Sequence, residues 1–398
     1  MTPIYLDYNA TTPVDPRVVE VMTPYLREHF GNPSSSGHIW GWSAERAVQK
    51  SRQHIAELLG CTALDIFFTS GSTESNNWAL RGLIENHFLR NPNEKFHVLT
   101  SSVEHNSVLK PLLQMQKLFP IELEILPVNS LGLVSIEQLK QKIKPSTRLM
   151  SFIWVNNEIG SINPIEDLAQ LAHENNIVFH TDATQAIGKI PVNLKNSAID
   201  LLSVSAHKMY GPKGVGALIV RQKSGVQLEP LLCGGGQERS LRSGTLNVPG
   251  IVGLGEACRI LKEEIAFEIP KSLQLQKYFW SEIQKQCPKA RLNGSPLTEL
   301  TQGFDKTSRS PVNLSVTFNK AFPAGGFQDP HLGVSASSAC STGSMSASHV
   351  LTGIGLSSED AAKTLRFSFG RFTQESDLKE AVHRVSQVFE STHLNLNN

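Results

Sequence analysis

Hydrophobic runs alternate with amphipathic segments along the first two thirds of the chain. Short runs rich in β-branched or aromatic residues predict buried strands at residues 65–70, 97–101, 149–155, 177–181 and 201–205. Helix-patterned segments lie between several of these strands, and their ends have recognisable signals: Ser43 as an N-cap, Gly60 as a stop and Pro164 in a first turn. This alternation predicts βαβ units and a mostly parallel sheet flanked by helices.

One predicted strand departs from that arrangement. The apolar run at 215–220 follows the strand that ends near Ser205 after little more than the turn H-K-M-Y-G-P-K-G. A parallel connection needs a crossover of about a dozen residues. We therefore expect this strand to run antiparallel to its neighbours.

Toward the C-terminus the pattern changes to that of a smaller α+β unit. A helix is expected at 272–286 and another from about Asp377, with strands at V-N-L-S-V-T-F and L-R-F-S-F. The 398 residues are also too many for one ordinary core. The predicted fold class is α/β, with a large domain at 15–262 and a small domain formed by 1–14 and 263–398.

The composition excludes some classes of partner. The chain has 37 basic and 36 acidic residues, so its net charge is close to zero. The protein as a whole therefore has no excess positive charge to attract nucleic acid or an anionic membrane. We expect no secretory leader and no membrane span, because no apolar segment is long enough. The five cysteines are odd in number and lack C-x-x-C pairs, which argues against disulfides and a metal site. A cytoplasmic protein that acts on a small molecule fits these features best.

Polar side chains follow several of the predicted strands. Lys208 lies where open α/β sheets bind ligands, although a lysine on a turn is more often a solvated charge. Ser72 and Thr73 follow a glycine turn that is either a phosphate cradle or a plain helix cap. Asp182 ends an apolar strand and either caps the next helix or pairs with a protonated ring nitrogen. A lysine for an imine, a phosphate cradle and an acid for a pyridinium nitrogen are the requirements of pyridoxal phosphate (PLP).

A series of motifs recurs in order along nearly the whole chain. They are L-D-Y-N-A-T-T-P, F-G-N-P-S-S, T-S-G-S-T-E-S-N-N, V-E-H-N-S-V, V-N-N-E-I-G, H-T-D-A-T-Q, S-A-H-K-M-Y-G-P-K-G, L-R-S-G-T, S-S-A-C-S-T-G-S and L-R-F-S-F-G-R-F-T. Together they resemble the NifS/IscS-type cysteine desulfurases, PLP-dependent enzymes of the class V aminotransferase family with the aspartate-aminotransferase type of fold. The resemblance implies conversion of L-cysteine to L-alanine with transfer of the sulfur as a persulfide.

The resemblance also implies a role for each matching residue. Lys208 carries the cofactor as a Schiff base and moves protons at the substrate Cα, Asp182 holds the pyridinium nitrogen, and His105 stacks on the ring as an acid or base. Taken alone, a histidine at this position is more often a packed or capping residue. The other assignments are Asn157 and Gln185 for the ring 3'-oxygen, Ser72, Thr73, Ser205 and His207 for the phosphate with Thr245 from a second subunit, and Asn32 and Arg366 for the substrate carboxylate. Thr245 implies a homodimer, and Arg371 stays an alternative to Arg366.

Cys340 lies in the stretch V-S-A-S-S-A-C-S-T-G-S. Its small hydroxyl and alanine neighbours are typical of an accessible loop, whereas a lone cysteine is more often a buried core residue. The resemblance implies that its thiolate attacks the substrate sulfur and passes the persulfide to an acceptor or an iron–sulfur scaffold protein. The preceding segment, 322–331, departs from the family pattern, because its two prolines and adjacent glycines disfavour the helix expected there.

Two other functions stay open from the sequence. Another PLP-dependent aminotransferase or lyase would leave Cys340 incidental, and a catalytically silent PLP-fold protein would act as a scaffold. The scaffold alternative predicts loss of Lys208, Asp182 or Cys340, and all three are present. The motifs leave open whether the sulfur supplies iron–sulfur cluster assembly or tRNA thiolation.

Overall fold

A seven-stranded sheet is the centre of the computed structural model, which describes residues 2–298, 308–322, 327–336 and 347–394. The strand order is β2-β8-β7-β6-β5-β3-β4. The strands are β2 (Ile66–Thr69), β3 (Phe96–Ser101), β4 (Ile121–Leu126), β5 (Thr147–Ile153), β6 (Val178–Asp182), β7 (Leu201–Ser205) and β8 (Gly216–Val220). β8 is antiparallel to β2 and β7 and the other pairs are parallel, which confirms the prediction for 215–220.

Strand β4 was not predicted from the hydrophobic pattern. It lies at the edge of the sheet and pairs with β3 alone. Glu122 is exposed and Glu124 half-buried, so its apolar run is interrupted at alternate positions. An edge strand with one partner tolerates such charges, which also protect the edge from pairing with other chains.

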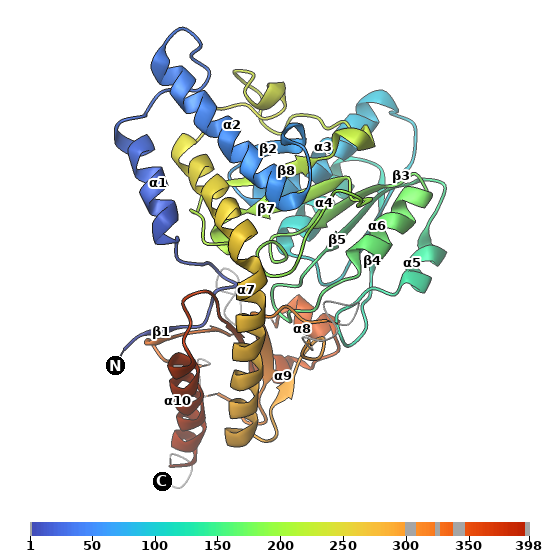
Figure 1. Ribbon diagram of the computed structural model, residues 1–398. Helices are drawn as coiled ribbons and strands as arrows, with labels where there is room; N and C mark the ends of the chain where they lie inside the picture. The colour runs from blue at the N-terminus through green and yellow to red at the C-terminus, as the bar shows by residue number, and fades with distance from the viewer. Residues whose placement is uncertain (1, 299–307, 323–326, 337–346, 395–398) are drawn as a thin grey trace.

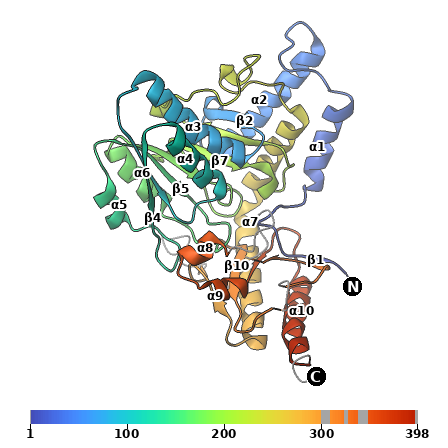
Figure 2. The same cartoon turned by 180° about the vertical axis from the view of Figure 1, so that it is seen from behind.

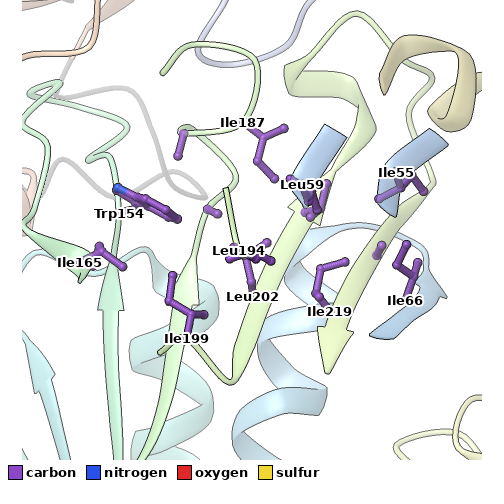
Figure 3. Close-up of a cluster of buried hydrophobic side chains, with 14 of the residues drawn as sticks. Ile55, Leu59, Ile66, Trp154, Ile165, Ile187, Leu194, Ile199, Leu202 and Ile219 are labelled. Atoms are coloured by element: carbon purple, nitrogen blue, oxygen red, sulfur yellow. The ribbon is translucent and has the colours of Figure 1, made fainter. Parts of the chain in front are cut away.

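Helices cover both faces of this sheet (Figure 1). One face packs against α2 (Ile39–Leu59), α5 (Ile136–Lys142), α6 (Ile165–Glu174) and α7 (Val248–Gln286), and the other against α3 (Ser72–Arg90) and α4 (Asn106–Leu118). Successive side chains of a strand serve opposite faces: Leu202 of β7 joins the first core, whereas Leu201 packs with Trp78 of α3. Figure 3 shows part of the first core, with Leu202 and Ile219 in the same cluster as Ile55 of α2.

The helix-end signals were only partly correct. Gly60 ends α2 with φ of 67°, a left-handed conformation that glycine adopts readily. The prediction of Ser43 as the N-cap is wrong, because α2 begins at Ile39 and His38 is its N-cap. The Nδ1 atom of His38 accepts a hydrogen bond from the Gly41 N–H (3.2 Å), the task expected of a serine. Pro164 precedes the first turn of α6 rather than lying in it.

A second, smaller unit contains the C-terminal part of the chain and the first strand (Figures 1 and 2). A four-stranded sheet has the order β12-β13-β10-β9, and β1 pairs with β11. The strands are β1 (Ile4–Tyr5), β9 (Arg291–Leu292), β10 (Asn313–Thr317), β11 (Leu332–Gly333), β12 (Ser335–Ala336) and β13 (Thr364–Ser368). The remaining elements of the chain are α1 (Pro16–Arg27), α8 (His349–Gly353), α9 (Ser358–Ala362), α10 (Glu375–Leu394) and the short 3₁₀ turns η1 (Ala63–Asp65), η2 (Ala206–Lys208), η3 (Gln222–Ser224) and η4 (Glu238–Ser240).

Helix α7 joins the two units. It runs from the face of the large sheet to the small sheet and α10 (Figure 1). The expectation of a separate helix at 272–286 is therefore wrong, because these residues continue one helix that contains Pro270. The predicted domain boundary at residue 262 falls within α7, and the division at that residue stays a prediction. Among the described helices, none is long and apolar enough to span a membrane.

Candidate active site

The ends of four strands bring predicted cofactor residues to one edge of the large sheet. His105 follows β3, Asn157 follows β5, Asp182 is the last residue of β6, and Lys208 follows β7 within η2. The carboxyl ends of parallel strands meet at the same edge, so residues that are far apart in the sequence gather there. This edge is the candidate active site.

Asn9, from the N-terminal segment, holds several of these residues together. Its carbonyl oxygen accepts hydrogen bonds from Lys208 Nζ (2.6 Å) and Gln185 Nε2 (2.9 Å). Its side-chain Nδ2 donates to the carbonyl oxygen of Asn157 (3.2 Å). Lys208 Nζ also donates to the carbonyl oxygen of Ala10 (2.6 Å). The Lys208 amine is thereby placed beside Gln185 and Asn157.

A buried hydrogen-bond network links Asp182 to His105. Asn76 Nδ2 donates to Asp182 Oδ2 (2.8 Å) and to Ser107 Oγ (2.8 Å), and Ser107 Oγ lies 2.7 Å from His105 Nδ1. Asp182 Oδ1 accepts from the Thr184 N–H (3.0 Å), so the residue also caps the following turn. The Asp182 carboxylate is 4% exposed. A buried negative charge of this kind is stabilised by a cationic partner such as a protonated ring nitrogen.

His105 caps α4 and keeps its ring accessible. Its Nδ1 accepts a hydrogen bond from the Ser107 N–H (3.1 Å), so Nε2 carries the proton of the neutral ring. Desolvation lowers the pKa of His105, and the nearby Asp182 charge opposes that shift. The residue is exposed and lines a cavity of about 370 Å³. The capping alternative is therefore correct, and it leaves the ring free to contact a ligand.

The start of α3 has the features of a phosphate-binding turn. Gly71 is the N-cap with φ of 145°, a conformation that favours glycine, and it offers no side chain to the first N–H groups of the helix. A Cβ atom on Gly71 would lie 3.4 Å from Ser205 Oγ, and one on Gly216 would lie 2.7 Å from the Gly71 Cα. Ser72 and Thr73 begin the helix. The glycine at position 216 thus lets β8 approach the turn before α3 closely, and the first N–H groups of α3, which have no side-chain cap, are suited to binding an anion.

Two other basic residues lie beside Lys208, and burial lowers the pKa of both. The pKa of His207 falls to about 4, and its Nδ1 lies 3.1 Å from Thr11 Oγ1. The pKa of Lys189 falls well below its ordinary value. Lys189 Nζ donates to Gln185 Oε1 and to Asn9 Oδ1 (3.4 Å). Because Lys189 donates to the Oε1 atom of Gln185, the Nε2 atom is the end of that amide that donates to Asn9.

The two candidate arginines lie in different surroundings. Arg366 of β13 lines the same cavity as His105 and Asn157. Arg371 lies over the ring of Tyr210 (4.3 Å) and forms ion pairs with Asp15, Glu264 and Glu268. Three carboxylates already surround Arg371, so Arg366 is the better candidate for a substrate carboxylate.

The structure does not bring Asn32 and Thr245 into this cluster. Cys340 lies outside the described residues. Asn32 is exposed in the connection between α1 and α2, where its Oδ1 accepts from the Ser34 N–H (2.9 Å). That connection lies at the end of α2 that is remote from the small sheet (Figures 1 and 2). Thr245 is exposed after η4. The roles given to these three residues stay predictions.

Sequence reasoning missed four polar residues that organise the site. They are Asn9, Asn76, Ser107 and Lys189. Asn9 and Asn76 lie inside motifs quoted above, L-D-Y-N-A-T-T-P and T-S-G-S-T-E-S-N-N, and their presence there was the available signal. Ser107 follows His105 by two residues, the spacing of a helix cap, and Lys189 had no signal because its partners are fixed only by the fold.

Glu104 is a buried carboxyl group on the same cavity. Its Oε1 accepts from Ser101 Oγ (2.6 Å) and the Ile153 N–H (3.0 Å), and Oε2 has no hydrogen-bond partner within the described chain. Burial raises the pKa of Glu104 to about 8. The pKa of Glu104 is higher in the folded protein than in the unfolded chain. Protonation of Glu104 therefore contributes fully to the stability of the fold below about pH 4.3, and this contribution is lost as the pH rises through about 8.

Glu104→Gln should therefore gain stability relative to the wild type as the pH rises. The glutamine stays neutral at every pH, whereas Glu104 must ionise in the wild type. The unfolding free energy of the variant should therefore rise relative to that of the wild type between about pH 5 and about pH 8. Urea denaturation across this range measures the difference, with Glu20→Gln on the exposed surface of α1 as the control. A difference that is constant with pH, or that shifts toward the wild type, contradicts the role of burial at Glu104.

Comparisons with known proteins agree with this geometry. The model of the aminotransferase class-V family matches residues 4–380. The cysteine desulfurase IscS of Neisseria gonorrhoeae is 44% identical over 387 residues, which are 96% of this chain and 91% of that protein. The mitochondrial cysteine desulfurase of Arthroderma benhamiae is 41% identical over 390 residues, 97% of this chain and 74% of that protein.

Solved structures give the same result. A NifS-like protein is 34% identical with a TM-score of 0.85, and the match covers 98% of this chain and 100% of that one. SspA, solved in complex with cysteine, is 36% identical with a TM-score of 0.78, covering 93% of this chain and 100% of that one. Both agree with the mostly parallel sheet and the smaller antiparallel sheet.

The chain belongs to the class-V aminotransferase family, whose members depend on PLP. Within that family it is a PLP-dependent cysteine desulfurase of the NifS/IscS type. The residues present fit the cofactor: an amine just after β7, a buried carboxylate at the end of β6 and a helix start at α3 whose first N–H groups have no side-chain cap.

Proposed function

We propose that this enzyme converts L-cysteine to L-alanine and takes up the sulfur on Cys340 as a persulfide. The arrangement that supports this most directly is the shared carbonyl oxygen of Asn157. It accepts from Arg366 Nη1 (3.0 Å) on the side of the cavity and from Asn9 Nδ2 on the side of Lys208. A chain of hydrogen bonds through Asn157 and Asn9 thus joins Arg366, which would hold the substrate carboxylate, to the Lys208 amine.

The cofactor residues divide into groups with distinct tasks in this proposal. The cofactor, when bound, supplies an electron sink for negative charge at the substrate Cα. Asp182 keeps that sink effective by holding the ring nitrogen protonated, and Lys208 removes and returns the Cα proton. His105 would contact the ring and would move a proton through Nε2. The other ligands are Asn157 and Gln185 for the ring oxygen, Ser72, Thr73, Ser205 and His207 for the phosphate, Thr245 from a second subunit, and Arg366 for the substrate carboxylate. The connection that contains Asn32 lies at the end of α2 remote from Arg366, so a role of Asn32 at the same carboxylate stays a prediction.

The sulfur step uses the thiolate of Cys340. The thiolate attacks the substrate sulfur, an S–S bond forms, and the Cβ–S bond breaks. The carbon fragment keeps the electron pair of the broken bond and takes up protons to become L-alanine. The terminal sulfur then passes to an acceptor thiol, so Cys340 returns as a thiolate. Because only a reduced cysteine can do this, a cytoplasmic location is part of the proposal.

A homodimer and a sulfur-accepting partner complete the proposal. Large apolar side chains around the start of α2 are half or more exposed: Phe30 (71%), Ile39 (63%), Trp40 (50%) and Trp42 (50%). Several large apolar side chains exposed in one short segment are typical of a contact with another chain, which supports the dimer that Thr245 requires. The acceptor is a sulfur-carrying or iron–sulfur scaffold protein, with cluster assembly or tRNA thiolation as the route served.

The proposed function is tested by incubating the PLP-loaded protein with L-cysteine and a thiol reductant. We expect L-alanine and sulfide in equal amounts, both dependent on L-cysteine. Conversion of an amino acid to its keto acid, with an added second keto acid accepting the amino group, would instead indicate an aminotransferase. No reaction with any amino acid, despite bound cofactor, would indicate a silent scaffold.

A further inference from the structure

We propose that Asp7 is a specificity-determining residue that competes with the substrate carboxylate for Arg366. The inference rests on the proposed function, in which Arg366 binds that carboxylate. Asp7 lies in the N-terminal segment just after β1, and none of the site roles described above belongs to it. Its carboxylate reduces the affinity of the site for carboxylate ligands and so favours release of the amino-acid product.

The guanidinium of Arg366 is held on two sides. Its Nη2 donates to Asp7 Oδ1 (2.8 Å) and to Ser335 Oγ (2.7 Å), and Ser335 Oγ itself donates to Asp7 Oδ1 (2.8 Å). Its Nη1 donates to the carbonyl oxygen of Asn157 (3.0 Å). The Nε atom is buried and has no hydrogen-bond partner among the residues described. The Nη2 group of Arg366 is thus taken by a carboxylate and a hydroxyl, whereas its Nε donor is unused.

Burial makes the charge of Asp7 significant. The side chains of Arg366 and Asp7 are 13% and 17% exposed, so water screens their interaction only weakly. A ligand carboxylate that enters the cavity meets an ion pair rather than a lone cation. It must share or displace the Asp7 contact, and that competition weakens its binding. Replacing the Asp7 charge by a neutral group removes the competition.

The backbone of Asp7 is anchored independently of its carboxylate. Asp7 forms a β-bridge with Ser368, and its carbonyl oxygen accepts a hydrogen bond from Tyr5 Oη (3.0 Å). The neighbouring Leu6 is fully buried in the core of the smaller unit. The segment is therefore held in place without the carboxylate, so a neutral side chain at position 7 tests the charge rather than the fold.

The test compares wild-type and Asp7→Asn holoenzymes by titration with two ligands. L-Alanine has an amine and a carboxylate, and cysteamine has an amine and a thiol but no carboxylate. The visible absorbance of the bound cofactor reports binding of each. Asparagine keeps an oxygen that can accept from Arg366 and Ser335. We expect the dissociation constant of L-alanine to fall on the order of tenfold and that of cysteamine to stay unchanged.

Control variants separate this effect from general changes. Asp329→Asn removes another carboxylate near an arginine, Arg384 (3.9 Å), outside the Arg366 cavity and should leave both constants unchanged. Asp7→Ser, a second neutral variant, should shift L-alanine binding in the same direction as Asp7→Asn. In an Arg366→Gln background the Asp7→Asn effect should vanish.

An unchanged or raised dissociation constant for L-alanine in the neutral Asp7 variants would overturn the inference, because it would make Asp7 a support for Arg366 rather than a competitor. Equal tightening of cysteamine binding would overturn it as well. Failure of the proposed function is a separate result, seen in the wild type as no sulfide from L-cysteine.

Discussion

Lys208→Ala is expected to abolish desulfuration, with turnover falling by more than about 10³-fold. The variant loses the amine that attaches the cofactor and the base that moves the Cα proton. Its site otherwise persists, because Asp182, Asn76 and Ser107 are linked by hydrogen bonds that do not involve Lys208. Added PLP should therefore still bind, but the absorbance that reports its link to lysine should be absent.

A matched control lies in the same turn. Lys213 is exposed five residues further along H-K-M-Y-G-P-K-G, so Lys213→Ala removes an equal charge without touching the Asn9 contact. This control should keep the absorbance and most of the turnover. A Lys208→Ala protein that retains the lysine-linked absorbance would show that another amine, such as Lys189, carries the cofactor.

Cys340→Ser is expected to remove turnover while leaving cofactor binding intact. A serine hydroxyl stays protonated near neutral pH and is a poor nucleophile toward sulfur, whereas a thiol reaches its thiolate. No cofactor contact is assigned to Cys340, so the visible absorbance and its response to L-alanine should match the wild type. Parallel sulfide and absorbance measurements on one preparation check both parts.

Cys233 provides the control for this substitution. It is an exposed cysteine, so Cys233→Ser tests whether loss of any accessible thiol affects the assay. Wild-type turnover is expected for it. Substantial L-alanine formation by Cys340→Ser would instead favour the alternative in which Cys340 is incidental and another PLP-dependent reaction is catalysed.

The fold was predictable where the hydrophobic pattern of a segment and the length of its connections indicate the same arrangement. The short turn before 215–220 identified β8 as antiparallel, because chain length alone excludes a parallel crossover there. Strand β4 was missed because its glutamates interrupt the apolar run. The length of α7 was also missed, because Pro270 and a change in composition resemble a boundary that tertiary packing overrides.

The candidate site was predictable where a residue lies at a strand end. Lys208 and Asp182 each terminate a buried run, so their position in the sequence indicates their position in the fold. Asn9 and Lys189 could not be recognised in this way, because their contacts join segments about 180 residues apart and depend on the packed structure. The assignments of Cys340, Asn32 and Thr245 rest on the family resemblance.

The central claim is that sulfur from L-cysteine is carried by Cys340. The most direct measurement is a reaction of holoenzyme with L-cysteine in the absence of reductant, followed by mass analysis of the peptides under thiol-preserving conditions. We expect one additional sulfur atom on the peptide that contains Cys340, in proportion to the L-alanine formed, and its loss on adding reductant. L-Alanine formed in the same amount with no sulfur on that peptide would contradict the account.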